Sequence, residues 1–406
     1  MCTMRGLDDM AYKAKDKKAA IGPDIDLDSY SLKSATHADV KNLGTIPEED
    51  RERMTLAGLD ASEKERAGTY IQRDATAVHS GSNIDGLEII PIRKALKEID
   101  WIRDYYWKLA SVDTDKYTAR VRLDLQDGYV IRALPGKKVT LPAQACLYLE
   151  KEGFNQNVHN IIIAEEESEL HVISGCASAS HVTRGLHAGV SEFYVKKDAK
   201  LSFTMIHHWA EDVVVRPRSV GIVEKGGLFL SNYISMKPVK SVQTYPTTYL
   251  VGKGAVARSY SLLVGSPGSE LDVGGRIYLQ AKDTRAEIVS RAITNGGNII
   301  SRGDIIGEVP GAKGHLECHG LILNGGIMQA IPELKGMVDG VELSHEAAVG
   351  KIAQEEILYL MSRGLTEEEA TATIVRGFLS VDIPGLPAPL KAEIDRAVEL
   401  SQKDVM

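Results

Sequence analysis

The sequence predicts a mainly β protein in which a strand-rich core is flanked by helical N- and C-terminal regions. Within residues 120–343, small or apolar residues alternate with polar ones, as in Arg276–Gln280 and Ala286–Ile293, and this period of two is typical of strands. Residues 1–119 and 344–406 instead carry apolar residues at spacings of three and four, the period of a helix. Glycine-rich turns recur roughly every 10 to 15 residues in the core. With no strict repeat visible, this pattern leaves a sandwich, a barrel and a stacked β-solenoid open.

The N-terminal region contains two candidate helices. Pro47 precedes three acidic residues, which is the composition of a helix start. A second helix is predicted over residues 91–110, where apolar residues would line one face. These residues are Ile92, Ala95, Leu96, Ile99, Ile102, Tyr106 and Leu109. The tract 1–28 is charged and loosely patterned, and its composition favours partial disorder.

From Ser344 onward the sequence predicts a helical hairpin. The first helix has an apolar stripe formed by Ile352, Ile357, Leu358, Leu360 and Met361. Gly364 is typical of a helix end, and Thr366 with Glu369 matches a capping box that begins the second helix. The second helix carries Ala370, Ile374, Val375 and Phe378, and the chain breaks at Pro384 and Pro387. An ordinary hairpin packed on its own core would have the same pattern.

Composition excludes several classes of protein. The formal net charge of −8 leaves no basic face, so we expect no nucleic-acid partner. The four cysteines, Cys2, Cys146, Cys176 and Cys318, are far apart, which argues against a disulfide framework or a structural zinc site. The sequence has neither an apolar signal core nor a stretch of about 20 apolar residues. We therefore expect a cytoplasmic protein with no membrane contact.

The segment Gly314–Gly320 and a later Ser-His-Glu sequence carry the side chains of a candidate metal site. They supply the thiol of Cys318, the imidazole of His345 and the carboxylate of Glu346, which are ligand types that hold iron. The alternative is that Cys318 is a small buried hydrophobe and the His-Glu pair is ordinary surface. If Cys318 lies on a strand, His319 points to the opposite face and is not expected to share its site.

Seven histidines crowd the central region, and each is expected to be a hydrogen-bonded core or surface residue rather than a ligand. They are His171, His181, His187, His207, His208, His315 and His319.

Several of these segments resemble one known family. The motifs are Ser344–Ala347, Gly350–Ile352, Tyr359–Ala370 and Ile374–Phe378, with Cys318–Gly320, Gly175–Ser178 and Leu186–Val190, and more faintly Gly68–Tyr70 and Asp104–Trp107. They resemble the SufB/SufD family of scaffold proteins for iron–sulfur cluster assembly. The resemblance covers most of the chain and is strongest over roughly the last 90 residues. It implies a right-handed β-helix, that is a β-solenoid, as the core, and a homodimer formed through that core, because a solenoid leaves terminal strand edges to be covered.

The resemblance also implies a set of cluster ligands. Cys318 aligns with the family's cluster cysteine, Glu346 with the acidic ligand of SufB, and His345 with the ligand histidine of SufD, so a homodimer could supply the whole set at its interface. This chain has Ser344 where SufB proteins have a first glutamate, which removes one potential ligand or base. Cys176 is a weaker candidate ligand. Whether the cluster is of the two-iron or the four-iron type stays open.

The family's sulfur-entry cysteine has no counterpart in this chain. The matching stretch, residues 216–224, contains no cysteine, so persulfide delivery by that route is not expected and free sulfide becomes the candidate sulfur source. Cys146 is expected to be a core residue. Cys2 lies in a tail that we expect to be mobile.

A partner follows from the resemblance as well, because the family uses its C-terminal region to dock a SufC-like ABC ATPase. This chain has no Walker A sequence, so ATP hydrolysis would come from the partner and the chain itself is not expected to be an enzyme. The expected docking residues are Ile352, Leu358, Leu360, Met361, Ile374 and Phe378. Apo iron–sulfur proteins would receive the cluster. Two other functions stay open: a structural adaptor of an ATPase complex without a cluster, and a β-helix carbohydrate-active enzyme, which would need paired carboxylates on one face.

Overall fold

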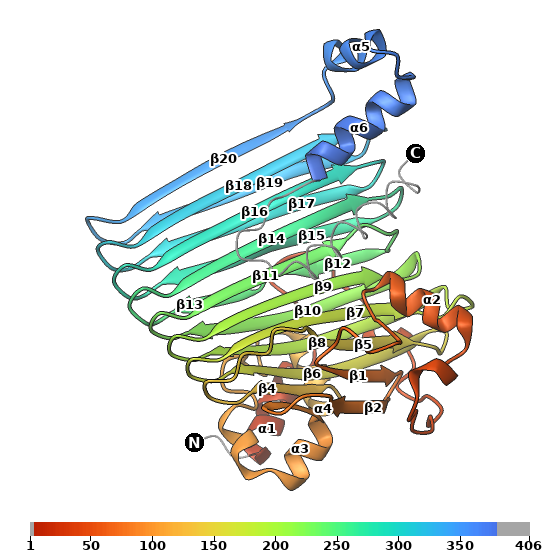
Figure 1. Cartoon of the computed structure of the whole chain (residues 1–406), viewed down its shortest axis with the longest axis vertical. Helices are drawn as coiled ribbons and strands as arrows, with labels where there is room; N and C mark the ends of the chain where they lie inside the picture. Colours follow the sequence, from red (N-terminus) through yellow and green to blue (C-terminus); the bar gives the residue numbers. More distant parts are fainter. Residues whose placement is uncertain (1–3, 380–406) are drawn as a thin grey trace.

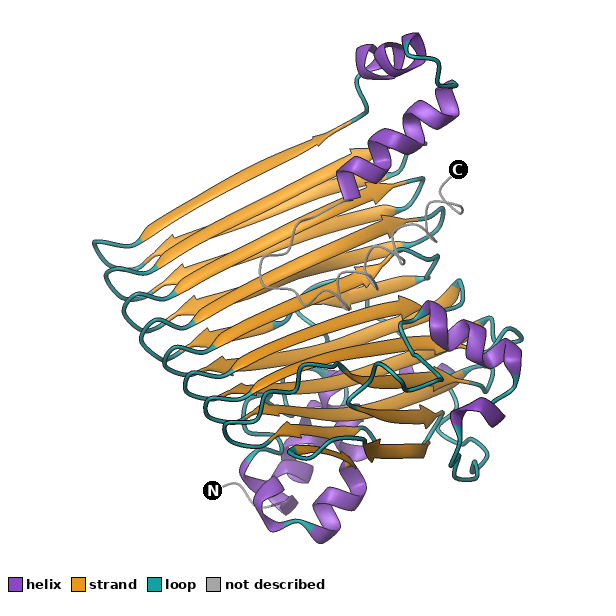
Figure 2. Ribbon diagram, in the orientation of Figure 1, coloured by secondary structure: helices purple, strands orange, loops and turns teal. Residues whose placement is uncertain are grey.

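Two long sheets face each other and wind into a β-solenoid of about eight turns, with helices at both ends (Figure 1, Figure 2). The computed structural model describes residues 4–379. The predicted mainly β fold is confirmed. Of the three architectures that periodicity left open, the solenoid implied by the family resemblance is the one that forms.

The sheet that carries Cys318, which we name sheet I, has the strand order β2 (Thr76–Ser82), β1 (Gly68–Arg73), β5 (Ala143–Leu149), β7 (Glu169–Ser178), β9 (Lys200–His208), β11 (Leu228–Ser235), β14 (Val256–Gly265), β16 (Arg285–Thr294), β18 (Lys313–Ile322) and β20 (Glu342–Gly350). Sheet II has the order β19 (Ile327–Gly336), β17 (Asn298–Gly307), β15 (Glu270–Leu279), β12 (Ser241–Thr244), β10 (Asp212–Val223), β8 (Arg184–Val195), β6 (Phe154–Ala164), β4 (Tyr129–Ala133) and β3 (Leu87–Pro91), and β13 (Thr247–Leu250) pairs with β10 and β15. Neighbouring strands are parallel except for the antiparallel pairs β1–β2 and β3–β4.

Each turn of the solenoid returns the chain to the same sheet after about 30 residues. Side chains that bond between neighbouring strands are 28, 29 or 31 residues apart, as with Lys313 and Glu342, and Asn160 and Ser191. Sequence inspection missed this repeat because its length varies from turn to turn. The turns share an alternation of residue types and no fixed motif.

The space between the sheets is filled by alternate residues of each strand. On β18, Leu316 and Cys318 belong to this core, while Glu317 and His319 form ion pairs on the outer face. The sheets approach closely at Gly303, where an added Cβ would lie 2.3 Å from Leu316 Cδ1. In a parallel pair, residues in register share a face of the sheet, so the direction of one side chain fixes that of its neighbours.

The N-terminal region, predicted to be mainly helical, also contributes strands. Its helices are α1 (Met4–Ala14), α2 (Glu48–Leu56), α3 (Ile92–Glu98) and α4 (Lys116–Leu123), with the short 3₁₀ helices η1 (Leu27–Ser29), η2 (Leu43–Thr45) and η3 (Asp100–Asp104). Between them, β1, β2 and β3 extend both sheets. The sequence did not reveal these strands, because β1 is stabilised by parallel pairing with β5, which lies some 75 residues further along the chain.

Two N-terminal expectations need correction, and one is confirmed. Helix α2 begins directly after Pro47, as predicted. The helix predicted over residues 91–110 is instead divided into α3 and η3, which meet at Ile99. The tract 1–28, whose composition favoured partial disorder, contains α1, because Ala11 and Ala14 are buried in a cluster with residues of α3 and α4.

A buried carboxylate fastens the N-terminal region to sheet II. Glu192 on β8 accepts hydrogen bonds from the backbone N–H groups of four consecutive residues, 107–110, and lies 2.8 Å from the His159 ring. Trp107 has a φ of +55°, and the turn there brings the amides to the carboxylate. The motif Asp104–Trp107 that the sequence singled out leads into this turn, so its structural role is to dock this region onto the solenoid.

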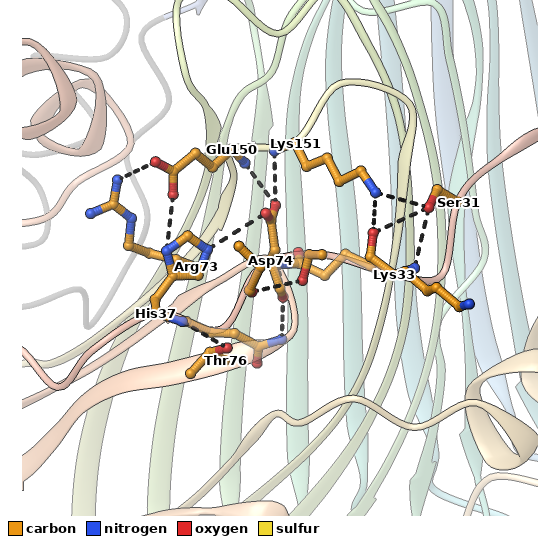
Figure 3. A network of polar contacts seen from close by, with 12 residues as sticks. Ser31, Lys33, His37, Arg73, Asp74, Thr76, Glu150 and Lys151 are labelled. Carbon is orange, nitrogen blue, oxygen red and sulfur yellow. Dashed lines mark hydrogen bonds and ion pairs between the residues drawn. The ribbon is translucent and has the colours of Figure 1, made fainter.

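A polar network holds the segment before α2 against the first turns of the solenoid (Figure 3). The His37 ring lies between two carboxylates, 3.7 Å from Asp74 and 3.4 Å from Glu150. Asp74 has a φ of +47°, which aspartate tolerates in turns, and its Oδ1 accepts the backbone N–H groups of Glu150 and Lys151. Arg73 adds an ion pair of 2.8 Å to Glu150. The β1–β2 turn, the β5–β6 turn and the N-terminal segment are thereby joined.

The C-terminal helical region begins about ten residues later than predicted. Residues 342–350 form β20, because β18 offers them an edge to pair with, and the helices are α5 (Gln354–Ser362) and α6 (Glu367–Leu379). Gly364 has a φ of +102° at the end of the first helix. Thr366 and Glu369 exchange side-chain to backbone hydrogen bonds, which confirms the capping box.

Within residues 4–379, no helix combines the length and the apolar character needed to cross a membrane. The chain break predicted at Pro384 and Pro387 lies outside the described residues.

Candidate functional site

Both sheets end in an edge strand at the C-terminal end of the solenoid. Strand β20 is the last of sheet I and β19 the last of sheet II, and no further strand of the described chain pairs with either (Figure 1). We name these two strands the open edge. Exposed apolar side chains on or beside it are Ile327, Met337, Val338 and Val349. Unpaired N–H and C=O groups along such an edge can accept a strand from another chain.

Cys318 lies one strand in from the open edge, on β18. Its side chain is fully buried between the sheets, with Sγ 3.8 Å from Ser301 Oγ, which in turn lies 2.9 Å from Ser290 Oγ. Burial raises the pKa of the Cys318 thiol, so the thiol is protonated at neutral pH. Its register neighbour on β20 is Ala347. At this end of sheet I, the thiol is therefore covered by one exposed strand, β20, which has the small side chain of Ala347 beside Cys318.

The three predicted ligands do not converge within one protomer. In the register of β18 and β20, His345 lies beside Leu316, and Glu346 lies beside Glu317. His345 therefore shares the inner face with Cys318, whereas Glu346 is on the outer face. Both β20 side chains are exposed. Among the described residues, no group of three or more His, Cys, Asp or Glu is arranged to hold a metal ion.

The outer face of the same strands carries a cluster that sequence reasoning missed. His319 Nδ1 lies 3.6 Å from Glu317 Oε1, and His319 Nε2 lies 3.5 Å from Glu346 Oε1. Arg291 on β16 pairs with Glu317, and its guanidinium lies 6.0 Å from the centre of the Phe378 ring on α6. We name Arg291, Glu317, His319 and Glu346 the outer-face cluster. The Glu-x-His spacing on β18, combined with a turn length of 29 residues, could have revealed it.

Cys176 is too far from Cys318 to share a ligand set with it in one protomer. Four strands separate β7 from β18 in sheet I, and strands lie about 4.8 Å apart, so the two cysteines are about 24 Å apart. Cys176 Sγ is fully buried, 3.5 Å from Met205 Sδ. Burial raises the pKa of this thiol well above its usual value. In this structure Cys176 is a core residue of the solenoid.

Cys146, Cys2 and the cysteine-free stretch 216–224 lie away from the Cys318 site or outside the described residues. Cys146 is buried in a cluster that includes Met54 of α2, which confirms its core role. Cys2 lies outside the described residues. The stretch 216–224 belongs largely to β10, where the buried Arg216 guanidinium donates hydrogen bonds to backbone carbonyls.

Two histidines inside the solenoid are hydrogen-bonded and neutral, as expected of core residues. His187 Nδ1 lies 2.9 Å from Gln156 Oε1, and His207 Nδ1 lies 3.1 Å from the Tyr233 hydroxyl. Burial lowers the pKa of His187 to about 4 and that of His207 to about 3. Both rings contact Trp209, so they pack the interior without carrying charge.

The predicted docking residues of the hairpin divide into two groups. Ile352 and Phe378 pack against the outer face of sheet I, whereas Leu358 and Met361 point to solvent on α5, 55% and 38% exposed. Tyr359, which was not among the predicted docking residues, is 58% exposed beside them. Leu360 and Ile374, like Ile352 and Phe378, are of intermediate burial. The free apolar surface of the hairpin is therefore on α5.

Comparison with known proteins places these features in a family. A family model described as SUF system FeS cluster assembly, SufBD core domain, matches residues 147–378, which contain the solenoid from β5 onward and the hairpin.

Curated relatives extend the similarity along the chain. An iron–sulfur cluster assembly SufBD family protein of Methanothermobacter thermautotrophicus (strain Winter) is 48% identical over 400 residues, covering 97% of this chain and 98% of the relative. A SufBD family protein of Archaeoglobus fulgidus is 51% identical over 358 residues, covering 88% and 96%. The iron–sulfur cluster assembly protein SufB of Bacillus subtilis is 30% identical over 387 residues, covering 92% and 82%.

Proposed function

We propose that this chain, which belongs to the SufBD family of iron–sulfur cluster assembly proteins, is a cytoplasmic scaffold on which clusters are built and from which they pass to apo iron–sulfur proteins. The cluster is cargo in this scheme, held briefly and then released. The observation that carries the proposal is the place of Cys318, one strand in from an unpaired edge.

The site is completed by a second copy of the chain. One protomer offers Cys318 and His345 on the inner face of sheet I and leaves the strand beside them unpaired. A homodimer formed through the open edge covers the exposed apolar residues of β19 and β20 and adds the partner's side chains to the same region. The ligand set then draws on both protomers, and Glu346, whose side chain is exposed on β20, contributes at the edge where the two protomers meet.

The chemistry of the three ligand residues suits a site on which a cluster is assembled and from which it is released. Thiolate is the strong ligand for cluster iron, and the buried Cys318 thiol gives up its proton when metal binds. Imidazole and carboxylate are weaker ligands for such iron, so His345 and Glu346 favour release. Because the 216–224 stretch has no cysteine, sulfur enters as free sulfide.

An ABC ATPase of the SufC kind docks on α5. Its contact surface consists of Leu358, Tyr359 and Met361, which are exposed apolar or aromatic residues on one short helix. An amphipathic helix set into a groove of a partner is a common recognition mode. Ile352 and Phe378 act indirectly, since they hold the hairpin against sheet I.

Anaerobic reconstitution with ferrous iron and sulfide tests the scaffold. The unaltered protein should gain iron, sulfide and visible absorbance, and Cys318→Ser should lower all three at least about tenfold, because a cluster ligand is lost. Cys146→Ser is the matched control, since that thiol is equally buried but lies under α2. Cys176→Ser should also retain the cluster, and Glu346→Ala should leave one that is more oxygen-labile.

Two outcomes would overturn this assignment. Equal iron and sulfide in Cys318→Ser would show that the thiol is not a ligand. Failure of the unaltered protein to gain either element would favour the adaptor without a cluster.

Co-purification with a SufC-like ATPase tests the docking surface. Leu358→Asp should abolish it while the fold persists, because the residue is exposed on α5. Val251→Asp, at an exposed apolar residue after β13, is the control. Unchanged binding by Leu358→Asp would place the interface elsewhere.

A further inference from the structure

We propose that His319 and Glu346 form an acceptance site for ferrous iron on the outer face of sheet I, separate from the Cys318 thiol, with Glu317 orienting the imidazole. This inference rests on the proposed assembly function, since it names the point at which one of the two raw materials is received.

The geometry around His319 distinguishes its two nitrogens. Nδ1 faces Glu317 Oε1 at 3.6 Å, whereas Nε2 faces Glu346 Oε1 at 3.5 Å. The Nε2 atom is inaccessible to solvent, and it makes no hydrogen bond within the described part of the chain. A carboxylate behind one ring nitrogen, with the other nitrogen directed at a second ligand, is the arrangement of carboxylate–histidine–metal sites. Both separations exceed a good hydrogen bond, so the ring lies between the two carboxylates without a hydrogen bond to either.

The distance between the two proposed ligands suits one metal ion. Two adjacent donors about 2.1 Å from a metal ion lie about 3 Å apart. His319 Nε2 and Glu346 Oε1, at 3.5 Å, reach that spacing by a small rotation of the Glu346 side chain, which is 66% exposed on the edge strand. Because the Glu346 side chain is exposed, water can fill the remaining coordination positions, which favours exchange of the ion.

Glu317 is already ion-paired, which disfavours its direct ligation of a metal ion. Arg291 pairs with the same Glu317 oxygen that faces His319 Nδ1. That carboxylate therefore stands behind Nδ1, while Arg291 largely balances its charge. This explains why the structure has no ready group of three converging ligands here, and it makes Glu317 a positioning residue rather than a ligand.

The ligand chemistry selects the kind of metal. Imidazole with carboxylate and water suits ferrous iron and similar borderline divalent ions, whereas thiolate is the ligand that clusters require. The outer-face cluster contains no sulfur donor, and Cys318 points to the opposite side of β18. Iron alone thus binds outside the solenoid, between β18, which also carries the Cys318 thiol, and the edge strand β20.

Anaerobic titration of the full-length protein with ferrous iron, without sulfide, tests the site by calorimetry and by competition with an iron chelator. His319→Ala and Glu346→Gln should each weaken binding about tenfold or more, and Glu317→Gln about tenfold, as is usual for loss of an orienting partner. His315→Ala is the matched control, because that outward imidazole on β18 contacts Ser344 instead. Circular dichroism checks the fold, and His319→Gln provides a smaller change if His319→Ala unfolds.

The outcome separates this inference from the scaffold proposal. Binding that survives in Cys318→Ser and falls in His319→Ala supports the outer-face site. Binding that falls in Cys318→Ser and survives in His319→Ala overturns it, although the scaffold still stands. Sulfide-free binding through His319 with no cluster in any reconstitution would instead support the iron site and reject the scaffold.

Discussion

The two ends of the solenoid treat their sheet edges in opposite ways. At the N-terminal end, β2 and β3 pair antiparallel with their neighbours. The backbone of Val40 also donates to Val78 on β2, and the polar network of His37 and Asp74 holds this segment in place. At the C-terminal end, β20 is exposed along most of its length and has no described strand beyond it. Proteins usually protect such edges, so this contrast supports a partner at the C-terminal end.

Charging the open edge should have the largest effect. Ile327→Lys combined with Val349→Lys places two lysines at exposed apolar positions on β19 and β20. In a homodimer through this edge, burying these charges should raise the dissociation constant at least about a hundredfold, which is close to 3 kcal/mol. Sedimentation velocity of the unaltered and altered proteins at micromolar concentration measures the change.

Val251→Lys is the control for charge at an exposed apolar residue away from the edge. A doubly substituted protein that stays dimeric would move the interface to another surface. An unaltered protein that sediments as a monomer would remove the homodimer from the proposal.

At the N-terminal end of the solenoid, where the sheet edges are covered, the largest loss of stability should come from Glu192→Ala. The change leaves four backbone N–H groups and His159 without their buried carboxylate. We expect the free energy of unfolding to fall by about 3 to 5 kcal/mol, as when one partner of a buried charged pair is removed. Urea unfolding measures it, with Glu166→Ala in an exposed turn as the control. A loss below about 1 kcal/mol would mean that the motif Asp104–Trp107 is held by packing alone.

A smaller effect on the free energy of unfolding, also at the N-terminal end of the solenoid, should depend on pH. Burial raises the pKa of Asp127, which accepts the Arg93 backbone N–H, from 3.8 to about 6. Because the folded-state pKa lies above the unfolded one, this group favours folding below pH 4, and its contribution is lost as the pH rises through 6. Asp127→Asn should remove this loss, of order 1 to 3 kcal/mol. Urea unfolding from pH 4 to pH 7 compares the two, and parallel pH profiles would contradict the assignment.

Local patterns in the sequence were sufficient for several parts of the molecule. The period of two predicted the strand core and placed Cys318 and His319 on opposite faces of one strand. Turn and cap chemistry predicted the helix start after Pro47 and the capping box of Thr366 and Glu369. These features depend on residues within a few positions of one another, so their physical causes are visible in a short stretch of chain.

Tertiary structure alone decided which distant residues became neighbours. The sequence grouped Cys318 with Glu346, whereas the register of β18 and β20 places Glu346 on the outer face beside Glu317 and His319. The strand order of sheet I also separates Cys176 from Cys318 by four strands. In a parallel solenoid the hydrogen bonds join residues about 30 positions apart, and the length of each turn sets the register. A shift of one residue would move every side chain of a strand to the other face, which is why the alternation alone could not assign the partners.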